Sequence, residues 1–344
     1  MSFIGVTIGD LHLDKLTKYW PNANAMQLAS ARGVIRSAKR RGASRAFYLG
    51  DLAEGIRDNT GNAMRLSEPA QCLLLSHFME MDKEIESHVI LGNHDWASEG
   101  SHSLSMFIEM QKHGVFKQTF FYPELDKVKI DGRKIAMMPY PNVEPPKGCE
   151  LGFAHYEVSG AVGDNGRAVH SQDEFEWSCP IIQGHLHTHQ RVRNHYYPGT
   201  LYQTSFGENE DKGYGMFHMG NKFQYKWVRN ETPFKLVNLR INKREDFKQL
   251  VSDELTLFKL FVHEDVRVPD DLLMKYPNIV NRLAFANEEE AVALEHDEFN
   301  SENQRIDLDD LSVLPDYLES KGGTKKQVER AVQIVEDFRV SKKS

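Results

Sequence analysis

The stretch FIGVTIGDLH, residues 3–12, decides the fold. It is an apolar run of strand length that ends in a Gly-Asp turn and then presents a histidine. The stretches RAFYLGD (45–51) and HVILGNHD (88–95) repeat this form. Helical patterns lie between them, at about 24–41 and 65–84. This alternation predicts βαβ units with a parallel sheet, and such sheets place their sites in the loops at the carboxyl ends of the strands.

The second part of the chain changes pattern. KVKIDGRKIAMMPY (127–140) predicts a hairpin turning at Asp131-Gly132, and GYGMFHMGNKFQYKWV (213–228) predicts another turning at Gly220-Asn221. LGFAHYE and PIIQGHLHTH are two more strand-to-loop segments. We therefore expect an α/β fold, a two-sheet sandwich flanked by helices, with a small α+β cap domain and C-terminal helices. The expected boundaries are 1–230 for the main domain, 231–287 for the cap, 288–308 for an acidic linker and 309–344 for the terminal helices.

The amino-acid composition excludes few classes of protein. The 344 residues are 40% hydrophobic and 27% charged, which is ordinary for a globular protein. Its three cysteines are dispersed, which disfavours a disulfide framework or a cysteine zinc site. With no secretory signal and no apolar run of membrane-spanning length, we expect a cytoplasmic protein without membrane contact. The net charge of −8 neither supports nor excludes a polyanionic substrate, because basic residues cluster between 32 and 45 and acidic ones between 288 and 310.

Polar residues at the predicted strand ends form an ordered set of candidate metal ligands: Asp10, His12, Asp51, Asn93, His155, His185 and His187. Each residue alone is weak evidence for a metal site, but chance would rarely place the whole set in this order at strand ends. Carboxylate, imidazole and amide ligands suit Mn, Fe or Zn. Asp51 is the best candidate to bridge two cations, which would clamp a phosphate ester and activate a water. His94 can then act as general acid, oriented by Asp95.

This pattern resembles the calcineurin-like metallophosphoesterase superfamily, and the matching motifs span residues 10–187. The resemblance implies two divalent metal ions and His94 as the catalytic acid. It assigns the first ion to Asp10, His12, Asp51 and His187. It assigns the second ion to Asp51, Asn93, His155 and His185.

Beyond these ligands, the chain resembles the SbcD-type nuclease subunit of double-strand-break repair, particularly its shorter phage-encoded versions. The segment 197–215, with YPGTL and then GENEDKGYG, carries this resemblance together with FAHYEVSG and the domain order. It implies a Mn²⁺-dependent exonuclease on duplex DNA ends and endonuclease on single strands. It also implies a homodimer whose terminal helices dock onto an SMC-like ATPase, in the host cytoplasm if phage-encoded. The chain departs from the pattern at Glu54, where many members have His or Asp, and in its short cap.

Several features allow two interpretations. The loop residues Lys15, Lys18, Tyr19 and Trp20 could contact DNA, although packing of the two aromatic rings onto the core is favoured. Gln190, Arg191 and Arg193 could grip phosphates, yet solvated edge charges are commoner. The basic cluster between 32 and 45 is expected to be a solvated helix face. The apolar stripe of the last helix, 324–340, fits either the chain's own cap or a partner groove, and the resemblance favours the partner.

Two other functions remain open from the sequence. A small-molecule phosphodiesterase or protein phosphatase could use the same metal core, although neither would need the cap and the terminal helices. A scaffold that keeps the fold without metal is disfavoured because the full set of candidate ligands is present.

Overall fold

The computed structural model describes residues 2–54, 66–98, 101–141, 147–163, 166, 168–169, 178–269, 271–287, 290–292 and 294. All of these belong to one compact unit, residues 1–296. Nearly all of the predicted acidic linker and all of the predicted C-terminal helices lie outside the described residues. Among the described helices, none is both long and apolar enough to cross a membrane.

The first six-stranded sheet has the order β14-β13-β1-β2-β3-β6. Its strands, in chain order, are β1 (Phe3–Ile8), β2 (Arg45–Tyr48), β3 (Glu86–Ile90), β6 (Thr119–Tyr122), β13 (Gly213–Met219) and β14 (Phe223–Arg229). Strands β1, β2 and β3 run parallel, as the sequence predicts. Strand β6, which the sequence analysis does not predict, adds parallel to β3, and β13 adds antiparallel to β1. The parallel register brings the carboxyl ends of β1, β2 and β3 to one edge of this sheet.

The second six-stranded sheet has the order β11-β12-β10-β9-β8-β7. Its strands are β7 (Asp126–Ile130), β8 (Arg133–Met138), β9 (Leu151–Ala154), β10 (Ile181–Gln183), β11 (Gln190–Val192) and β12 (His195–Tyr197). The predicted hairpin turn between β7 and β8 is confirmed, since Asp131 has φ 49° and Gly132 has φ 79°. Strands β8, β9 and β10 run parallel to one another, so their carboxyl ends also share one edge.

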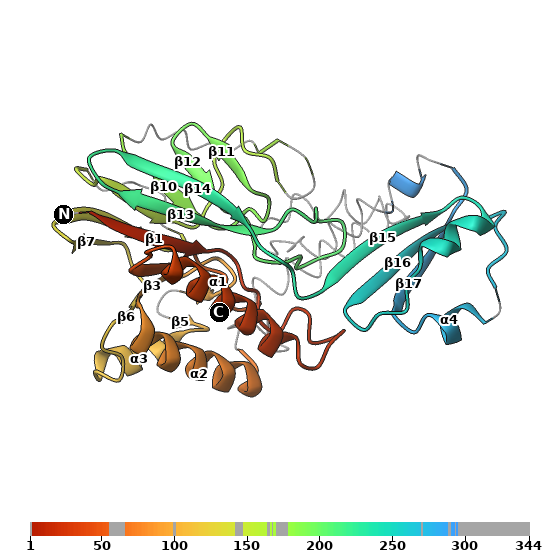
Figure 1. Cartoon of the computed structure of the whole chain (residues 1–344), viewed down its shortest axis with the longest axis horizontal. Helices are drawn as coiled ribbons and strands as arrows, with labels where there is room; N and C mark the ends of the chain where they lie inside the picture. The colour runs from red at the N-terminus through yellow and green to blue at the C-terminus, as the bar shows by residue number, and fades with distance from the viewer. Residues whose placement is uncertain are drawn as a thin grey trace, which may run out of the picture. The chain divides into compact units, whose positions relative to one another are not determined.

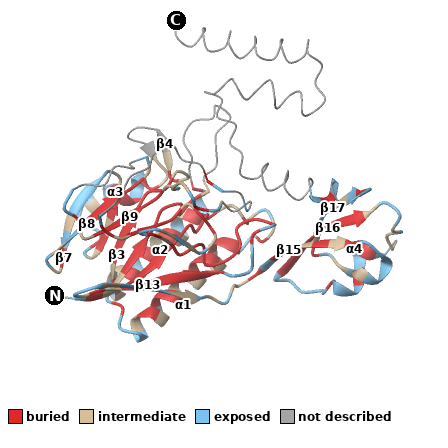
Figure 2. Cartoon of the chain, turned by 90° about the horizontal axis from the view of Figure 1, so that it is seen from above, coloured by how far each residue is buried: buried red, intermediate tan, exposed pale blue. Residues whose placement is uncertain are grey.

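The predicted α/β class with two sheets is confirmed. Aromatic rings pack between the sheets, with Phe47 stacked on Phe153 at 4.0 Å between centroids. Helices α1 (Ala23–Arg40), α2 (Glu68–Glu84) and α3 (Ser105–Lys112) bury their apolar faces in a second core cluster on the other side of the first sheet. The central strands of both sheets are largely buried (Figure 2), whereas the edge strands β7, β11 and β14 are partly exposed. A short hairpin, β4 (Trp96–Ser98) and β5 (Ser101–His102), precedes α3.

The cap region forms a sheet of its own. Strands β15 (Lys235–Ile241), β16 (Thr256–His263) and β17 (Ile279–Phe285) run parallel in that order, as Figure 1 shows. A 3-10 helix, η1 (Arg244–Gln249), and the short α4 (Leu272–Lys275) connect them. Gln203 pairs with both the amide and the carbonyl of Leu236, each at 3.0 Å, and so ties β15 to the loop before β13. The predicted boundary at residue 230 stays a prediction.

The basic cluster forms ion pairs on the helix surface. Arg36 Nη2 lies against Glu80 Oε1 at 2.5 Å, and Lys39 Nζ lies 3.4 Å from Glu84 Oε2. Arg45 pairs with Asp131 at 2.9 Å. These contacts fit the interpretation of a solvated helix face better than that of a ridge reserved for phosphates.

One buried histidine makes folding stability depend on pH. His77 is fully buried and lies 2.7 Å from the Tyr48 hydroxyl, and burial lowers its pKa from 6.5 to about 3. The unfolded chain therefore binds a proton here below pH 6.5 that the folded chain does not, so stability falls as the pH falls. Urea unfolding at pH 7.5 and pH 5.0 should show wild type losing about 2 kcal/mol more than His77→Gln, which cannot titrate. Equal losses in the two proteins would contradict this prediction.

Candidate metal centre

Five strand ends supply the candidate ligands. Asp10 and His12 follow β1, Asp51 follows β2, and Asn93 follows β3 in the first sheet. The other three ligands follow β9 and β10 of the second sheet: His155, His185 and His187. The seven residues come together because both sheets direct the carboxyl ends of these strands to one place. Four of them have positive φ angles, Asp10 at 28°, His12 at 46°, Asp51 at 49° and His185 at 80°. Such strained backbone is typical of functional sites.

The glycine before each of two ligand segments lets the strand ends approach closely. A Cβ at Gly184 would lie 2.5 Å from the Leu49 carbonyl oxygen and 2.9 Å from Nδ1 of His155. A Cβ at Gly92 would overlap the carboxylate of Asp51. Glycine is therefore needed here because neighbouring backbone and ligand side chains occupy the space of a side chain.

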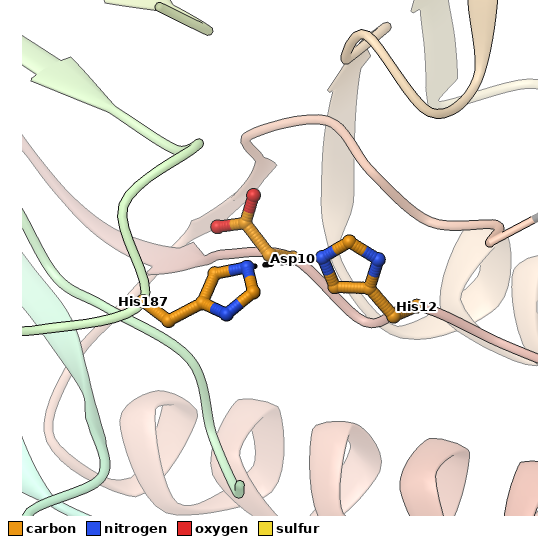
Figure 3. A group of neighbouring side chains, drawn as sticks. All are labelled: Asp10, His12 and His187. Carbon is orange, nitrogen blue, oxygen red and sulfur yellow. Dashed lines mark hydrogen bonds between the residues drawn. The ribbon is translucent and has the colours of Figure 1, made fainter. Parts of the chain in front are cut away.

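The first group of candidate ligands is Asp10, His12 and His187 (Figure 3). All three are buried, and Nε2 of His12 lies 3.0 Å from Nε2 of His187. Nδ1 of His12 lies 2.7 Å from Glu54, and Nδ1 of His187 lies 3.0 Å from Glu208. A carboxylate beside Nδ1 favours the tautomer with a proton there, which leaves the lone pair on Nε2. Two lone pairs then face each other, an arrangement that a cation between them would stabilise.

The second group is Asp51, His155 and His185, with Asn93 beside them. Nδ1 of His155 donates to the Leu49 carbonyl at 2.7 Å. Burial would lower the pKa of His155, but the carboxylates of Asp51 and Asp10 outweigh it and raise that pKa to about 9. Its protonated Nε2 lies 3.2 Å from Asp51 Oδ2 and 2.9 Å from Asn93 Oδ1, which are both acceptors, and a cation could replace that proton. Nδ1 of His185 is 3.0 Å from the same Asn93 oxygen. Carboxylate, amide and imidazole atoms thus converge on one point.

The two groups meet at Asp51. Its Oδ2 lies 3.9 Å from Nε2 of His12 on one side and 3.2 Å from Nε2 of His155 on the other. Its Oδ1 accepts a hydrogen bond from the backbone amide of His94 at 2.7 Å. This position between the groups is the one that a bridging carboxylate needs. The assignment of the seven residues to two ions stays a prediction.

The donor set fits divalent cations. Oδ2 of Asp10 is buried and has no hydrogen-bond partner, although burying an unpaired carboxylate oxygen is costly. Burial lowers the pKa of His12 and of His185 to about 3, which keeps both rings neutral, the state that binds metal. Burial would raise the pKa of Asp51, but the charges of His155 and His94 outweigh it and hold that pKa well below its usual range. Asp51 is therefore ionised, as a bridging ligand must be.

His94 is the predicted general acid, and the structure places the side chain of Glu54 beside it. Nε2 of His94 lies 3.9 Å from Oδ2 of Asp51. The carboxylate beside its Nδ1, at 3.3 Å, is that of Glu54. Asp95, predicted to orient His94, accepts hydrogen bonds from the amides of Gly92 and Ala53, both at 3.0 Å. Asp95 thus fixes the backbone of the loops that carry Asn93, His94 and Asp51.

A buried ion pair supports the candidate ligand His187. Glu208 and Lys212 are both almost fully buried and lie 2.6 Å apart, while Lys212 also donates to the carbonyl of His187 at 3.2 Å. The hydroxyls of Thr204 and Ser205 donate to the same Glu208 oxygen that faces His187, at 2.7 and 2.9 Å. Glu208 and Lys212 belong to the motif GENEDKGYG, residues 207–215, but the sequence alone predicts no role for either residue. Their spacing by four residues is the only local signal for the pair.

The structure favours packing roles for the loop aromatics. Trp20 is buried, stacks near Phe234 at 4.9 Å and donates its indole N–H to the Glu254 carbonyl at 2.8 Å. Tyr19 meets the ring of Phe206 at 5.9 Å. The ammonium groups of the loop also have neighbours within the chain: Lys15 lies 3.8 Å from Glu54, and Lys18 lies over the Tyr19 ring. Contacts of these residues with DNA stay predictions.

The charged residues after the last ligand pair lie along β11 and its turn. Arg191 donates to the Arg193 carbonyl at 3.0 Å and lies over the ring of Tyr196. Gln190 pairs with both backbone groups of Val162, at 2.8 and 2.7 Å, and so fastens a neighbouring loop. These contacts give the side chains of Gln190 and Arg191 partners within the chain, and phosphate binding by Arg191 and Arg193 stays a prediction.

A comparison with curated proteins found a relative that is named a phosphoesterase. The chain is 26% identical over 214 residues to a protein of Invertebrate iridescent virus 6 named "Putative phosphoesterase 244L", covering 55% of this chain and 72% of the viral protein. A solved archaeal phosphodiesterase shares 10% identity at a TM-score of 0.35, covering 66% of this chain and 100% of its own. A predicted phosphoesterase from Streptococcus pneumoniae shares 13% at 0.29, covering 67% and 90%. Structural similarities this low do not bear on function. No protein-family model matches the chain.

Proposed function

We propose that the chain is a metal-dependent phosphodiester hydrolase that acts on DNA. The observation that carries the metal-dependent part is the convergence of acceptor atoms, with Nε2 of His12 and of His187 only 3.0 Å apart and Asp51 between the two ligand groups. The similarity to the viral protein supports phosphoester hydrolysis. The ligand set is free of sulfur, which fits Mn²⁺ in both groups.

The residues of the chain have separate tasks in this proposal. Asp10, His12, Asp51 and His187 would hold one cation, and Asp51, Asn93, His155 and His185 would hold the other. When bound, the pair supplies Lewis-acid polarisation of the phosphate and a water of lowered pKa. His94 donates a proton from Nε2 to the leaving oxygen as its bond to phosphorus breaks. Its exposed fraction of 20% allows it to reach a substrate at the surface of the site.

The choice of DNA rests on the segment 197–215, through which the chain resembles SbcD-type nucleases. In the structure this segment contains Glu208 and Lys212, which support the ligand His187, and Gln203, which joins it to the cap. The motif that carries the resemblance to SbcD-type nucleases thus contacts the proposed metal centre at His187. A homodimer and docking of residues 309–344 on an SMC-like ATPase are further parts of this proposal, and that segment lies outside the described residues.

Digestion of end-labelled duplex and single-stranded DNA tests the proposal. Wild type should degrade DNA only when Mn²⁺ is added, and His94→Ala should be slower by roughly 10²–10⁴-fold, the usual contribution of a general acid. His113→Ala is a matched control because His113 is exposed and lies at the end of α3, away from the ligand segments. If wild type hydrolyses a simple phosphodiester but leaves DNA intact even with a candidate ATPase present, the nuclease assignment is wrong and the metal centre stands.

A further inference from the structure

A pair of stacked rings reaches the surface two residues beyond the candidate ligand His187. The imidazole of His189 stacks on the indole of Trp227, with centroids 4.7 Å apart and planes at 20°. His189 is exposed, and Trp227 is half-buried on β14, the edge strand of the first sheet. Because this stacking covers only one face of the imidazole, its other face is open to solvent. The pair therefore presents a flat ring beside a segment that carries a candidate metal ligand.

The orientation of the Trp227 ring is fixed by its surroundings. Its indole N–H donates to the carbonyl of Pro198 at 3.0 Å. Gly213 leaves room for the ring, since a Cβ at that position would lie 2.6 Å from two ring atoms of Trp227. A hydrogen bond and close backbone thus hold the indole in place before any ligand arrives, and a site that is already ordered loses little entropy on binding.

The backbone of His189 is held just as closely. A Cβ at Gly199 would lie 2.6 Å from the carbonyl oxygen of His187 and 3.0 Å from the amide nitrogen of His189. The amide of Thr200 and the ammonium of Lys212 both donate to that carbonyl oxygen of His187, each at 3.2 Å. The contacts that position the candidate ligand therefore position the imidazole of His189 as well.

A cation lies beside the two rings. Arg229 follows Trp227 by two residues on β14, so the two side chains leave the same face of the strand. The guanidinium of Arg229 lies 3.3 Å from the carboxylate of Asp211, but both side chains are largely exposed, and water weakens such a pair. A phosphate group could therefore replace Asp211 at this guanidinium. Flat rings next to cations are the means by which proteins hold single-stranded nucleic acid.

We propose that the pair of His189 and Trp227 is a stacking site for one base of a single-stranded DNA whose backbone reaches the metal centre. The inference rests on the proposed action on DNA and names the form of DNA that this side of the site holds. Within a duplex, neighbouring bases cover both faces of each base, whereas a base in a single strand can place one face on the imidazole. Because every base has a flat face, the site tolerates any sequence.

Two oligonucleotides of equal charge separate base stacking from phosphate binding. One is a fluorescently labelled single strand of thymidines, and the other has the same number of phosphates but abasic sugars throughout. Binding to the full-length protein is measured by fluorescence anisotropy with Ca²⁺ in place of Mn²⁺. Wild type should bind the strand with bases more tightly than the abasic strand. His189→Ala should reduce this preference by about 5–10-fold, the lower part of the range for one stacked base.

Two further variants control for the loss of the imidazole. His189→Phe keeps a flat ring at this position and should keep the preference for the strand with bases. His113→Ala should also keep it, because His113 is an exposed histidine at the end of α3, away from the stacked rings.

The outcomes distinguish the stacking site from the proposed function. An unchanged preference in His189→Ala, or an equal loss of affinity for both oligonucleotides, would overturn the stacking site while the proposed hydrolysis of DNA stands. Loss of the preference in His189→Phe would overturn it too, since stacking requires only a flat ring. If wild type binds neither oligonucleotide, the proposed action on DNA is wrong, and the stacking site is wrong with it.

Discussion

Replacing Asp51 by asparagine is expected to lower phosphodiester hydrolysis by at least roughly 10³-fold, more than the usual loss from a single stabilising group. Asp51 lies between both groups of candidate ligands, so its carboxylate is the one side chain that both cations would share. The side-chain amide of the replacement keeps an oxygen for the His94 N–H, which Asp51 accepts at 2.7 Å. The fold should therefore persist while the negative charge between the cations is lost.

Initial rates on DNA and on a simple phosphodiester, at several Mn²⁺ concentrations, provide the measurement for Asp51→Asn. Wild type should also show a melting temperature that rises with Mn²⁺, because an ion that binds only the folded state stabilises it, and the variant should lose this rise. Asp126→Asn is the matched control, since Asp126 is exposed at the start of β7. A variant that retains wild-type rates would show that Asp51 does not bridge the cations.

The second large effect is expected at the buried pair of Glu208 and Lys212. Glu208→Gln leaves the ammonium of Lys212 buried without its charge partner, now 2.6 Å away. Removing one member of such a pair typically costs about 3–5 kcal/mol. The same change should weaken Mn²⁺ binding by about 10–100-fold. A carboxylate beside Nδ1 of His187 makes its Nε2 a more basic metal ligand, and the amide of glutamine does so less. Urea unfolding and calorimetric titration measure the two effects.

A double variant separates charge balance from support of the ligand. Glu208→Gln combined with Lys212→Met removes both charges, so most of the lost stability should return. Mn²⁺ binding should stay weak, since His187 still lacks its carboxylate. Recovery of wild-type Mn²⁺ affinity in the double variant would mean that Glu208 serves only to neutralise Lys212.

The parts of the fold that could be predicted are those that depend on short stretches of neighbouring residues. The apolar runs at 3–8, 45–48 and 86–90 end in glycine and a polar residue, which indicates strands and the edge where their ligands gather. The turn at Asp131-Gly132 has a residue pair that accepts positive φ, so its hairpin could also be predicted. In both cases the information lies within a few neighbouring residues.

Contacts between distant segments could not be predicted. Glu208 lies 21 positions from His187, and only the tertiary fold brings its carboxylate to that ring. Asp95 is adjacent to His94 in sequence, yet its carboxylate accepts from loop amides while Glu54 lies beside the ring. Trp20 is buried because Phe234 and Glu254 of a later region reach it. Sequence spacing places residues at a site, whereas the direction of each side chain depends on what packs around it.

The most direct test of the metal centre is Mn²⁺ binding to the purified full chain. Metals are first removed with a chelator, and Mn²⁺ is then added back while binding is measured by calorimetry and by electron paramagnetic resonance. The two groups around Asp51 predict two ions per chain, close enough for their spins to couple, with both lost in Asp51→Asn. A chain that binds no Mn²⁺ at millimolar concentration, or binds it equally well without Asp51, would contradict the account.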